Sequence, residues 1–242
     1  MNRIYLSMAS LSMAASLLLP ACTNQPDSPS NGAFPIDSHT VAYYDFEDAT
    51  LSLDKTGNGK WSLVNATLGN GFAGRGLICD SGKDARLDTV FADGTPEGSI
   101  ELYIQPVPGF DPAGSYSIIG TNGSRCNLFY SRGNLYFLKN HDGIFKTCAA
   151  PVPLGPGKWR KIAATWGSKG MRLFVGDSLV AQNGDTTNYR NYAAGGLEYT
   201  TFYVGRKSTC CLEAVGISPN QAGFFYWPGG IDEIRFSDIQ RY

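Results

Sequence analysis

Two alternating apolar patterns that flank one glycine-rich turn constrain this chain more than any other feature. They lie within residues 157–175, on either side of a turn at residues 167–170. The apolar positions at strand-like spacing are Trp159, Ile162, Ala164, Met171, Leu173 and Val175. Alternation on both sides of a tight turn predicts an antiparallel β-hairpin.

Composition extends this pattern to the whole chain. Glycine makes up 29 of 242 residues, and charged residues are 17%, against roughly 25% in an average domain. A second hairpin is predicted at residues 127–138 around a turn at 131–134, and Asp142-Gly143 predicts the next turn. No helical periodicity is sustained, so we expect an all-β protein with one sandwich of about 200 residues.

Five segments resemble a known family in the order that the family has them. They are an opening strand at residues 44–48 with a loop at 54–59, a strand at 97–106, the hairpin at 157–175, a strand at 202–206 and a closing strand at 229–236. Together they resemble the laminin G-like jelly rolls of the concanavalin A-like lectin and glucanase superfamily. The resemblance implies a two-sheet antiparallel β-sandwich over residues 41–242.

The N-terminus has the pattern of an export signal. Arg3 is followed by a mainly apolar segment, and Leu19-Pro20-Ala21-Cys22 resembles the bacterial lipobox. That resemblance implies removal of residues 1–21, acylation of Cys22 and a lipid anchor in the membrane. An ordinary secretory signal with an incidental cysteine is the alternative.

Residues 22–40 are expected to form the acylated cysteine and a flexible tether, since they are rich in Pro, Ser and Asn. Thr23 after the acceptor cysteine resembles the outer-membrane address of Gram-negative lipoproteins. We therefore expect a bacterial cell-envelope location. Without Arg3, the charge is 19 − 21 = −2, so nothing favours nucleic acid as a partner.

Five cysteines besides Cys22 allow disulfides in an exported protein. Cys126 and Cys148 could meet across neighbouring strands, and Cys79 could pair with Cys210 or Cys211. Sequence does not fix the pairing, and the odd number leaves at least one thiol without an internal partner.

Residue-level support for catalysis is missing. Retaining glycosidases need two carboxylates about 5–5.5 Å apart, yet the one acid-x-acid triplet is Asp45-Phe46-Glu47 on the opening strand. There is no Gly-x-Ser-x-Gly motif, and His141 falls in a predicted turn. We therefore expect a protein that is not an enzyme.

The family resemblance implies two kinds of binding residue. A structural Ca²⁺ often joins the first and last strands, and the matching acids here are Glu47, Asp54 and Asp232. The alternative is that these acids cap strands or pair with Arg235.

For sugar rings, the candidate ligand-binding residues are Tyr103, Tyr130, Arg132 and Tyr136. Aromatic residues at strand spacing can equally belong to the core. The sequence thus predicts an envelope-anchored, non-enzymatic module that binds glycan or an envelope protein. A structural envelope domain without a small ligand, or an atypical glycoside hydrolase, is the alternative.

Overall fold

The computed structural model describes residues 34–47, 54–58, 62–80, 82–87, 90–92, 94–121, 125–190, 201–206 and 226–242. These residues form strands, turns and loops, and no helix that could cross a membrane lies among them. The strands are β1 (Thr40–Tyr44), β2 (Ser62–Val64), β3 (Thr67–Asn70), β4 (Arg75–Cys79), β5 (Ala85–Leu87), β6 (Gly98–Pro106), β7 (Ser115–Thr121), β8 (Cys126–Ser131), β9 (Asn134–His141), β10 (Ile144–Pro151), β11 (Arg160–Trp166), β12 (Met171–Val175), β13 (Ser178–Asn183), β14 (Phe202–Val204) and β15 (Gly229–Ser237).

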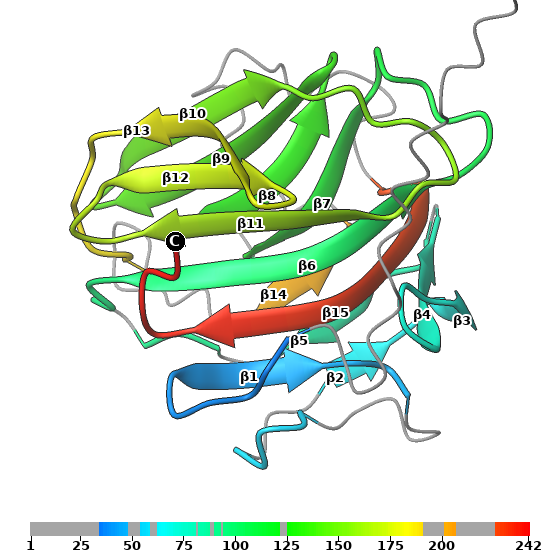
Figure 1. The fold of residues 1–242 in the computed structure, drawn as a ribbon, viewed down its shortest axis with the longest axis horizontal. Coiled ribbons are helices and arrows are strands. Elements are labelled where there is room, and N and C mark those ends of the chain that lie inside the picture. The colour runs from blue at the N-terminus through cyan, green and yellow to red at the C-terminus, as the bar shows by residue number, and fades with distance from the viewer. Residues whose placement is uncertain are drawn as a thin grey trace, which may run out of the picture.

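The strands form two antiparallel sheets that pack face to face (Figure 1). The front sheet has the order β13-β12-β11-β6-β15-β4-β3, and β1 also pairs with β15. The back sheet has the order β10-β9-β8-β7-β14-β5-β2. The predicted all-β, two-sheet sandwich is therefore confirmed.

The three predicted turns join the predicted strands. Strands β11 and β12 pair with Ile162 opposite Val175, and the amide of Gly170 donates to the carbonyl of Gly167 at 2.9 Å. The turn between β9 and β10 has Asp142 and Gly143 at φ 48° and 83°. Two consecutive positive φ angles match the twist of the flanking strands, which explains the Asp-Gly pair.

The core lies between the two sheets. Ile100, Leu102 and Ile104 on β6 point into it, and so do Leu135 and Phe137 on β9. Side chains on a strand alternate between faces. The residues between these positions therefore lie on the outer faces of the sandwich.

The disulfide that the sequence allowed between Cys126 and Cys148 is absent, since both cysteines are free. These residues lie on β8 and β10, and β9 runs between the two strands. Two strand spacings of about 4.8 Å exceed the Cα separation of at most about 7 Å that a disulfide spans. Both thiols are free and buried, and burial raises the pKa of each to about 12. Cys79 is also a buried free thiol, whereas Cys210 and Cys211 lie outside the described residues.

The N-terminal part of the described chain packs on the domain. Phe34 is buried, and the guanidinium of Arg235 donates to the carbonyl of Pro35 at 2.8 Å. Residues 34–40, which the composition placed in a tether, therefore belong to the folded unit because an aromatic anchor and an arginine hold them. Cys22 and the tether up to residue 33 lie outside the described residues.

Candidate functional site

Three partly exposed aromatic rings gather on the outer face of the front sheet. Phe72 stacks on Tyr103, with ring centroids 3.7 Å apart and planes at 13°. Trp159 meets the edge of Phe72 at 6.5 Å. We call Phe72, Tyr103 and Trp159 the aromatic platform. The buried Phe34 supports it from the side, 5.6 Å from Tyr103.

Asp232 on β15 holds Phe72 in this position. The turn between β3 and β4 contains Phe72, and the amides of Phe72 and Ala73 donate to Oδ2 of Asp232 at 2.8 and 3.2 Å. Asp232 pairs in register with Tyr103 on the neighbouring strand β6. A carboxylate 160 residues away in sequence thus places Phe72 over Tyr103.

A second carboxylate, that of Glu47, is hydrogen-bonded to the end of the same turn. Oε1 of Glu47 accepts a hydrogen bond from the amide of Arg75 at 2.6 Å. A Cβ at Gly71 would overlap the carboxylate of Asp232, and a Cβ at Gly74 would overlap that of Glu47. These glycines are therefore required where the two acids approach the backbone. Burial, together with the nearby charge of Glu47, raises the pKa of Asp232 to about 8.

Backbone strain marks the same place. Phe46 precedes Glu47 with φ 57°, and Glu233 follows Asp232 with φ 54°. Positive φ is uncommon for residues of this size and concentrates at functional positions. The pairing of β15 with β6 also shifts register between Asp232 and Arg235. The chain thus bends beside each acid, which brings both carboxylates to one turn.

Two adjacent carboxylates are a donor set suited to a hard cation. Glu47 and Asp232 are two of the three acids that the family resemblance implies for Ca²⁺, and their oxygens also accept hydrogen bonds from backbone amides. Asp54 lies apart from them. Its carboxylate accepts from the amides of Tyr43 at 2.8 Å and Thr56 at 3.0 Å, so it caps a loop. Among the described residues, no three His, Cys, Asp or Glu side chains form a metal-binding group.

The predicted sugar-binding residues do not form one site. Tyr103 belongs to the aromatic platform. Tyr130 points into the core, with its hydroxyl donating to the carbonyl of Val152 at 3.2 Å and its ring 5.5 Å from that of Phe110. The expectation for Tyr130 is therefore wrong, because its position on β8 faces inward.

Tyr136 and Arg132 lie on the back sheet, away from the platform. Tyr136 points outward and stacks on Phe129, with centroids 4.7 Å apart. Arg132 is exposed in the turn between β8 and β9, at φ 49°. Sequence reasoning missed Phe72 as a site residue. An aromatic residue in a stretch with four glycines, at positions 69, 71, 74 and 76, was the available signal.

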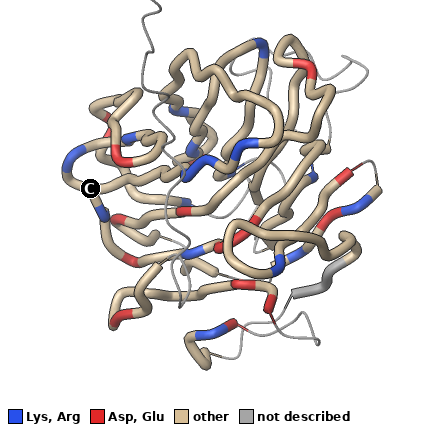
Figure 2. The backbone as a smooth tube through the Cα atoms, turned by 45° about the vertical axis from the view of Figure 1, so that its right-hand side comes forward, with Lys and Arg blue, Asp and Glu red and all other residues tan. Residues whose placement is uncertain are grey.

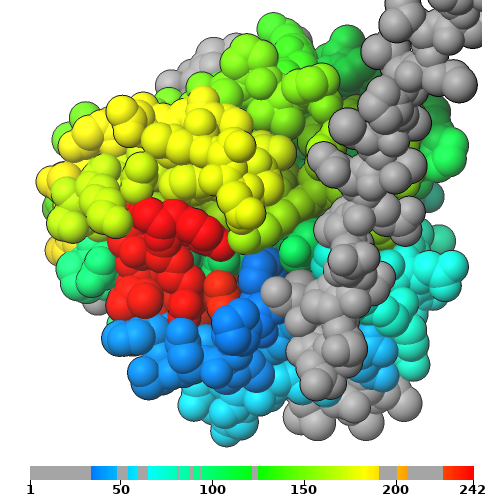
Figure 3. All heavy atoms as spheres, viewed as in Figure 1, coloured from blue at the N-terminus to red at the C-terminus, as the bar shows by residue number. Residues whose placement is uncertain are grey.

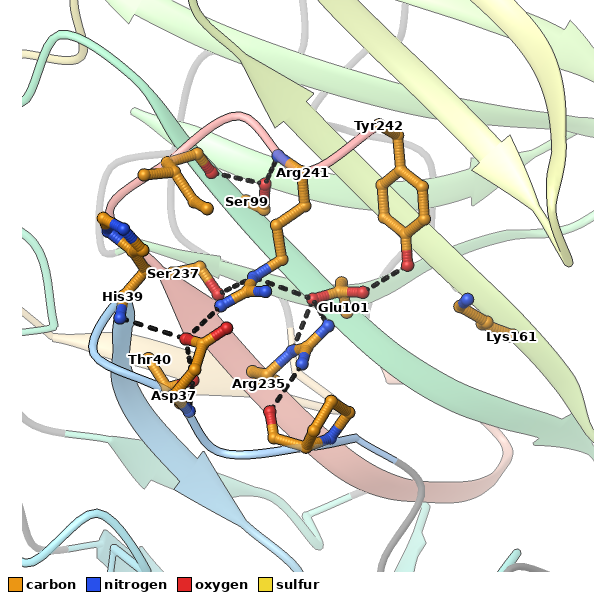
Figure 4. A network of polar contacts seen from close by, with 12 residues as sticks. Asp37, His39, Thr40, Ser99, Glu101, Lys161, Arg235, Ser237, Arg241 and Tyr242 are labelled. Carbon is orange, nitrogen blue, oxygen red and sulfur yellow. Dashed lines mark hydrogen bonds and ion pairs between the residues drawn. The ribbon is translucent and has the colours of Figure 1, made fainter.

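Glu101, next to the platform on β6, is committed to an ion-pair network (Figure 4). It is fully buried, and Oε2 accepts from Nε of Arg235 at 2.6 Å. Its other oxygen accepts from the hydroxyl of Tyr242 at 2.5 Å. A carboxylate held in this way is a structural anchor, not a free general acid or nucleophile.

The network also joins the two ends of the described chain. Arg241 donates to Asp37 at 2.6 Å, and its backbone amide donates to Ser99 at 2.9 Å. In the space-filling view, the C-terminal residues lie at the surface between the N-terminal segment and β12–β13 (Figure 3). Both ends therefore cover part of the front sheet, beside the platform.

Comparison with known proteins identifies a fold. No family model matches the chain, and no curated protein matches it. Solved structures do match, among them the binding domain of botulinum neurotoxin serotype C1, with a TM-score of 0.61, 13% identity, and coverage of 84% of this chain and 49% of that chain. The receptor-binding domain of the C/D mosaic serotype matches with a TM-score of 0.60, 14% identity, and coverage of 86% and 49%.

A third match is the serotype D ligand-binding domain in complex with N-acetylneuraminic acid, with a TM-score of 0.59, 14% identity, and coverage of 84% and 48%. The fold is a lectin-like β-sandwich. The chain spans about half the length of the structures it matches, and identity this low shows the fold alone.

Proposed function

We propose that this protein is a non-enzymatic glycan-binding module of the laminin G-like type, held at the bacterial envelope by acylated Cys22. The observation that carries the proposal is the aromatic platform on the outer face of the front sheet. The neurotoxin domains of the same fold are receptor-binding or ligand-binding domains, and one of them was solved in complex with N-acetylneuraminic acid. These neighbours support the class of function and leave the ligand open.

The platform has the properties that a sugar ring needs. Phe72 and Trp159 are partly exposed, and Phe72 is stiffened by its stack on Tyr103. A rigid ring loses little conformational entropy when a sugar packs against it. Gln105 and Lys161 lie on the neighbouring strands β6 and β11 and carry side-chain donors. Affinity should be modest, because each protein–sugar hydrogen bond replaces one to water.

A cation bound by Glu47 and Asp232 would support the platform. When bound, Ca²⁺ supplies positive charge that removes the repulsion between these two carboxylates. The residues themselves do the rest, since Asp232 holds the amides of Phe72 and Ala73. We therefore propose that Ca²⁺ stabilises the turn that presents Phe72, without Asp54 as a ligand.

The test is a glycan array probed with the soluble chain from Thr23 onward. Wild-type protein should bind at least one glycan class, and Trp159→Ala should lose the same signals. Tyr136→Ala is the matched control, because it removes a stacked aromatic ring from the other sheet. An equal loss of glycan signal in both variants, or an unchanged signal for Trp159→Ala, would show that the glycan does not bind on the platform. Release of reducing sugar by wild-type protein would overturn the non-enzymatic proposal.

A further inference from the structure

Two arginines flank one tyrosine on the outer face of the back sheet. The guanidinium carbons of Arg86 and Arg206 lie 5.5 and 5.2 Å from the centroid of the Tyr203 ring. Arg86 is exposed, while Tyr203 and Arg206 are partly exposed. Their neighbours on the strands, Phe202 and Val204, belong to the core, so Tyr203 points outward. The three side chains therefore form an accessible cluster, which we call the arginine pair.

Sheet register explains the arrangement. Tyr203 on β14 lies directly opposite Arg86 on β5, and on its other side it lies opposite Gly120 on β7. Directly opposed residues on antiparallel strands have Cβ atoms about 4.5–5.5 Å apart. Cation–π contact then holds both guanidinium groups at the ring of Tyr203 despite their like charges.

The positive charge of the cluster is incompletely balanced. Asp84 contacts Arg206 at 3.5 Å. Among the residues that the structure describes, Arg86 has no carboxylate within ion-pair distance. The cluster therefore carries an excess positive charge on a chain whose formal net charge is −1. Acidic and basic residues are interspersed elsewhere along the tube (Figure 2), so attraction of an anion here is local.

An unpartnered donor lies next along the same row of outward positions. Gly120 is opposite Asn127 on β8, and the Asn127 carboxamide covers the place where a Gly120 side chain would be. Its Oδ1 accepts from the hydroxyl of Ser117 at 3.3 Å, whereas its Nδ2 is buried and has no hydrogen-bond partner. Asn127 is only 1% exposed, so a ligand does not reach this donor, and the accessible part of the row is the arginine pair.

We propose that the arginine pair is a binding site for an acidic saccharide, whose carboxylate or sulfate group accepts hydrogen bonds from the guanidinium groups of Arg86 and Arg206. Guanidinium groups bind planar or tetrahedral oxyanions through charge-assisted hydrogen bonds. The negative net charge of the chain disfavours nucleic acid, which needs an extended basic surface. This site is independent of the aromatic platform, which lies on the other sheet.

The experiment measures binding of the chain from Thr23 onward to immobilised heparin, polygalacturonate and neutral dextran at near-physiological salt. Heparin and polygalacturonate present sulfate and carboxylate groups respectively, and dextran presents neither. We expect binding to at least one acidic polymer and none to dextran. Arg86→Gln should weaken that binding by about tenfold or more, since one charge-assisted hydrogen bond contributes at least that factor.

Arg132→Gln is the matched control because it removes the same charge from an exposed turn of the same sheet. It should bind as the wild type does. Arg206→Gln should weaken binding too, with thermal melting measured alongside because it unpairs Asp84. No binding to either acidic polymer would overturn the proposal. Equal effects of Arg86→Gln and Arg132→Gln would also overturn it, as would equally tight binding of single-stranded DNA.

Discussion

Replacing Glu101 by Gln should strongly destabilise the domain. The carboxylate is fully buried, and Arg235, which is 4% exposed, donates to its Oε2 from Nε at 2.6 Å and approaches it from a terminal nitrogen at 2.5 Å. The variant keeps the shape of the side chain and removes its charge. The guanidinium of Arg235 is then left in the interior without a counterion.

The magnitude follows from that burial. Removing one partner of a buried ion pair costs about 3–5 kcal/mol, because the other charge stays desolvated. For a domain of this size, 1 kcal/mol lowers the melting temperature by about 2–4 °C. Glu101→Gln should therefore lower the melting temperature by roughly 6–20 °C.

Urea unfolding followed by tryptophan fluorescence measures the free energy, and calorimetry measures the melting temperature. The double variant Glu101→Gln with Arg235→Met should recover part of the loss, since both buried charges are gone. Asp177→Asn is the control: it breaks the ion pair of Lys161 with a side chain that is 90% exposed, so its stability should match the wild type. A loss for Glu101→Gln no larger than for this control would refute the reasoning.

Four further outcomes are expected. The hydrogen bond from Arg241 holds the pKa of Asp37 well below its ordinary value of 3.8. The difference in free energy of unfolding between wild type and Asp37→Asn should therefore be constant above about pH 5 and shrink as the pH falls through the lowered pKa. A difference that does not change with pH in acid denaturation curves would contradict this. Tyr130→Ala should lower the free energy of unfolding in urea by about 3–5 kcal/mol, because it empties a core position. A stability close to that of the wild type would show that Tyr130 does not contribute to the core. Chelation of Ca²⁺ should lower the melting temperature of the wild type and leave that of Asp232→Asn unchanged, whereas identical curves with and without chelator would remove the cation from the account. Cys22→Ser should abolish acyl labelling and release the protein from membrane fractions, so labelling that persists would rule out the lipid anchor.

Local features of the sequence were sufficient to predict the hairpins of the fold. The hairpin of β11 and β12 could be predicted because its turn glycines and its alternating strands lie within 19 consecutive residues, 157–175. The turn at Asp142-Gly143 was predictable for the same reason. Each relies on interactions between near neighbours, which a single chain displays directly.

The site could be predicted only in part, because it depends on which face of a strand each side chain occupies and on contacts between residues that are far apart in the sequence. Phe129 and Tyr130 are adjacent, yet one points outward and the other into the core. Both faces of β8 are buried, so the pattern of apolar residues does not reveal which aromatic residue faces outward. Phe72 depends on Asp232, which approaches it only after the sheet has formed.

The pairing state of the cysteines could not be predicted for a related reason. Cys126 and Cys148 are close in sequence, and the pattern shows a hairpin near them. It does not show that a whole strand separates them, since that depends on the order of β8, β9 and β10 in the sheet. Connectivity between non-adjacent strands is a property of the assembled sandwich.

The account depends most directly on whether the aromatic platform binds sugar. The deciding measurement is a calorimetric titration of the strongest glycan from the array against wild type, Trp159→Ala and Tyr136→Ala, with the melting temperature of each recorded. The account predicts that Trp159→Ala remains folded and weakens binding by about tenfold or more, because a lost aromatic contact of about 1.4 kcal/mol or more corresponds to that factor. Tyr136→Ala should bind as the wild type does. Equal affinity of wild type and folded Trp159→Ala for the glycan would contradict it.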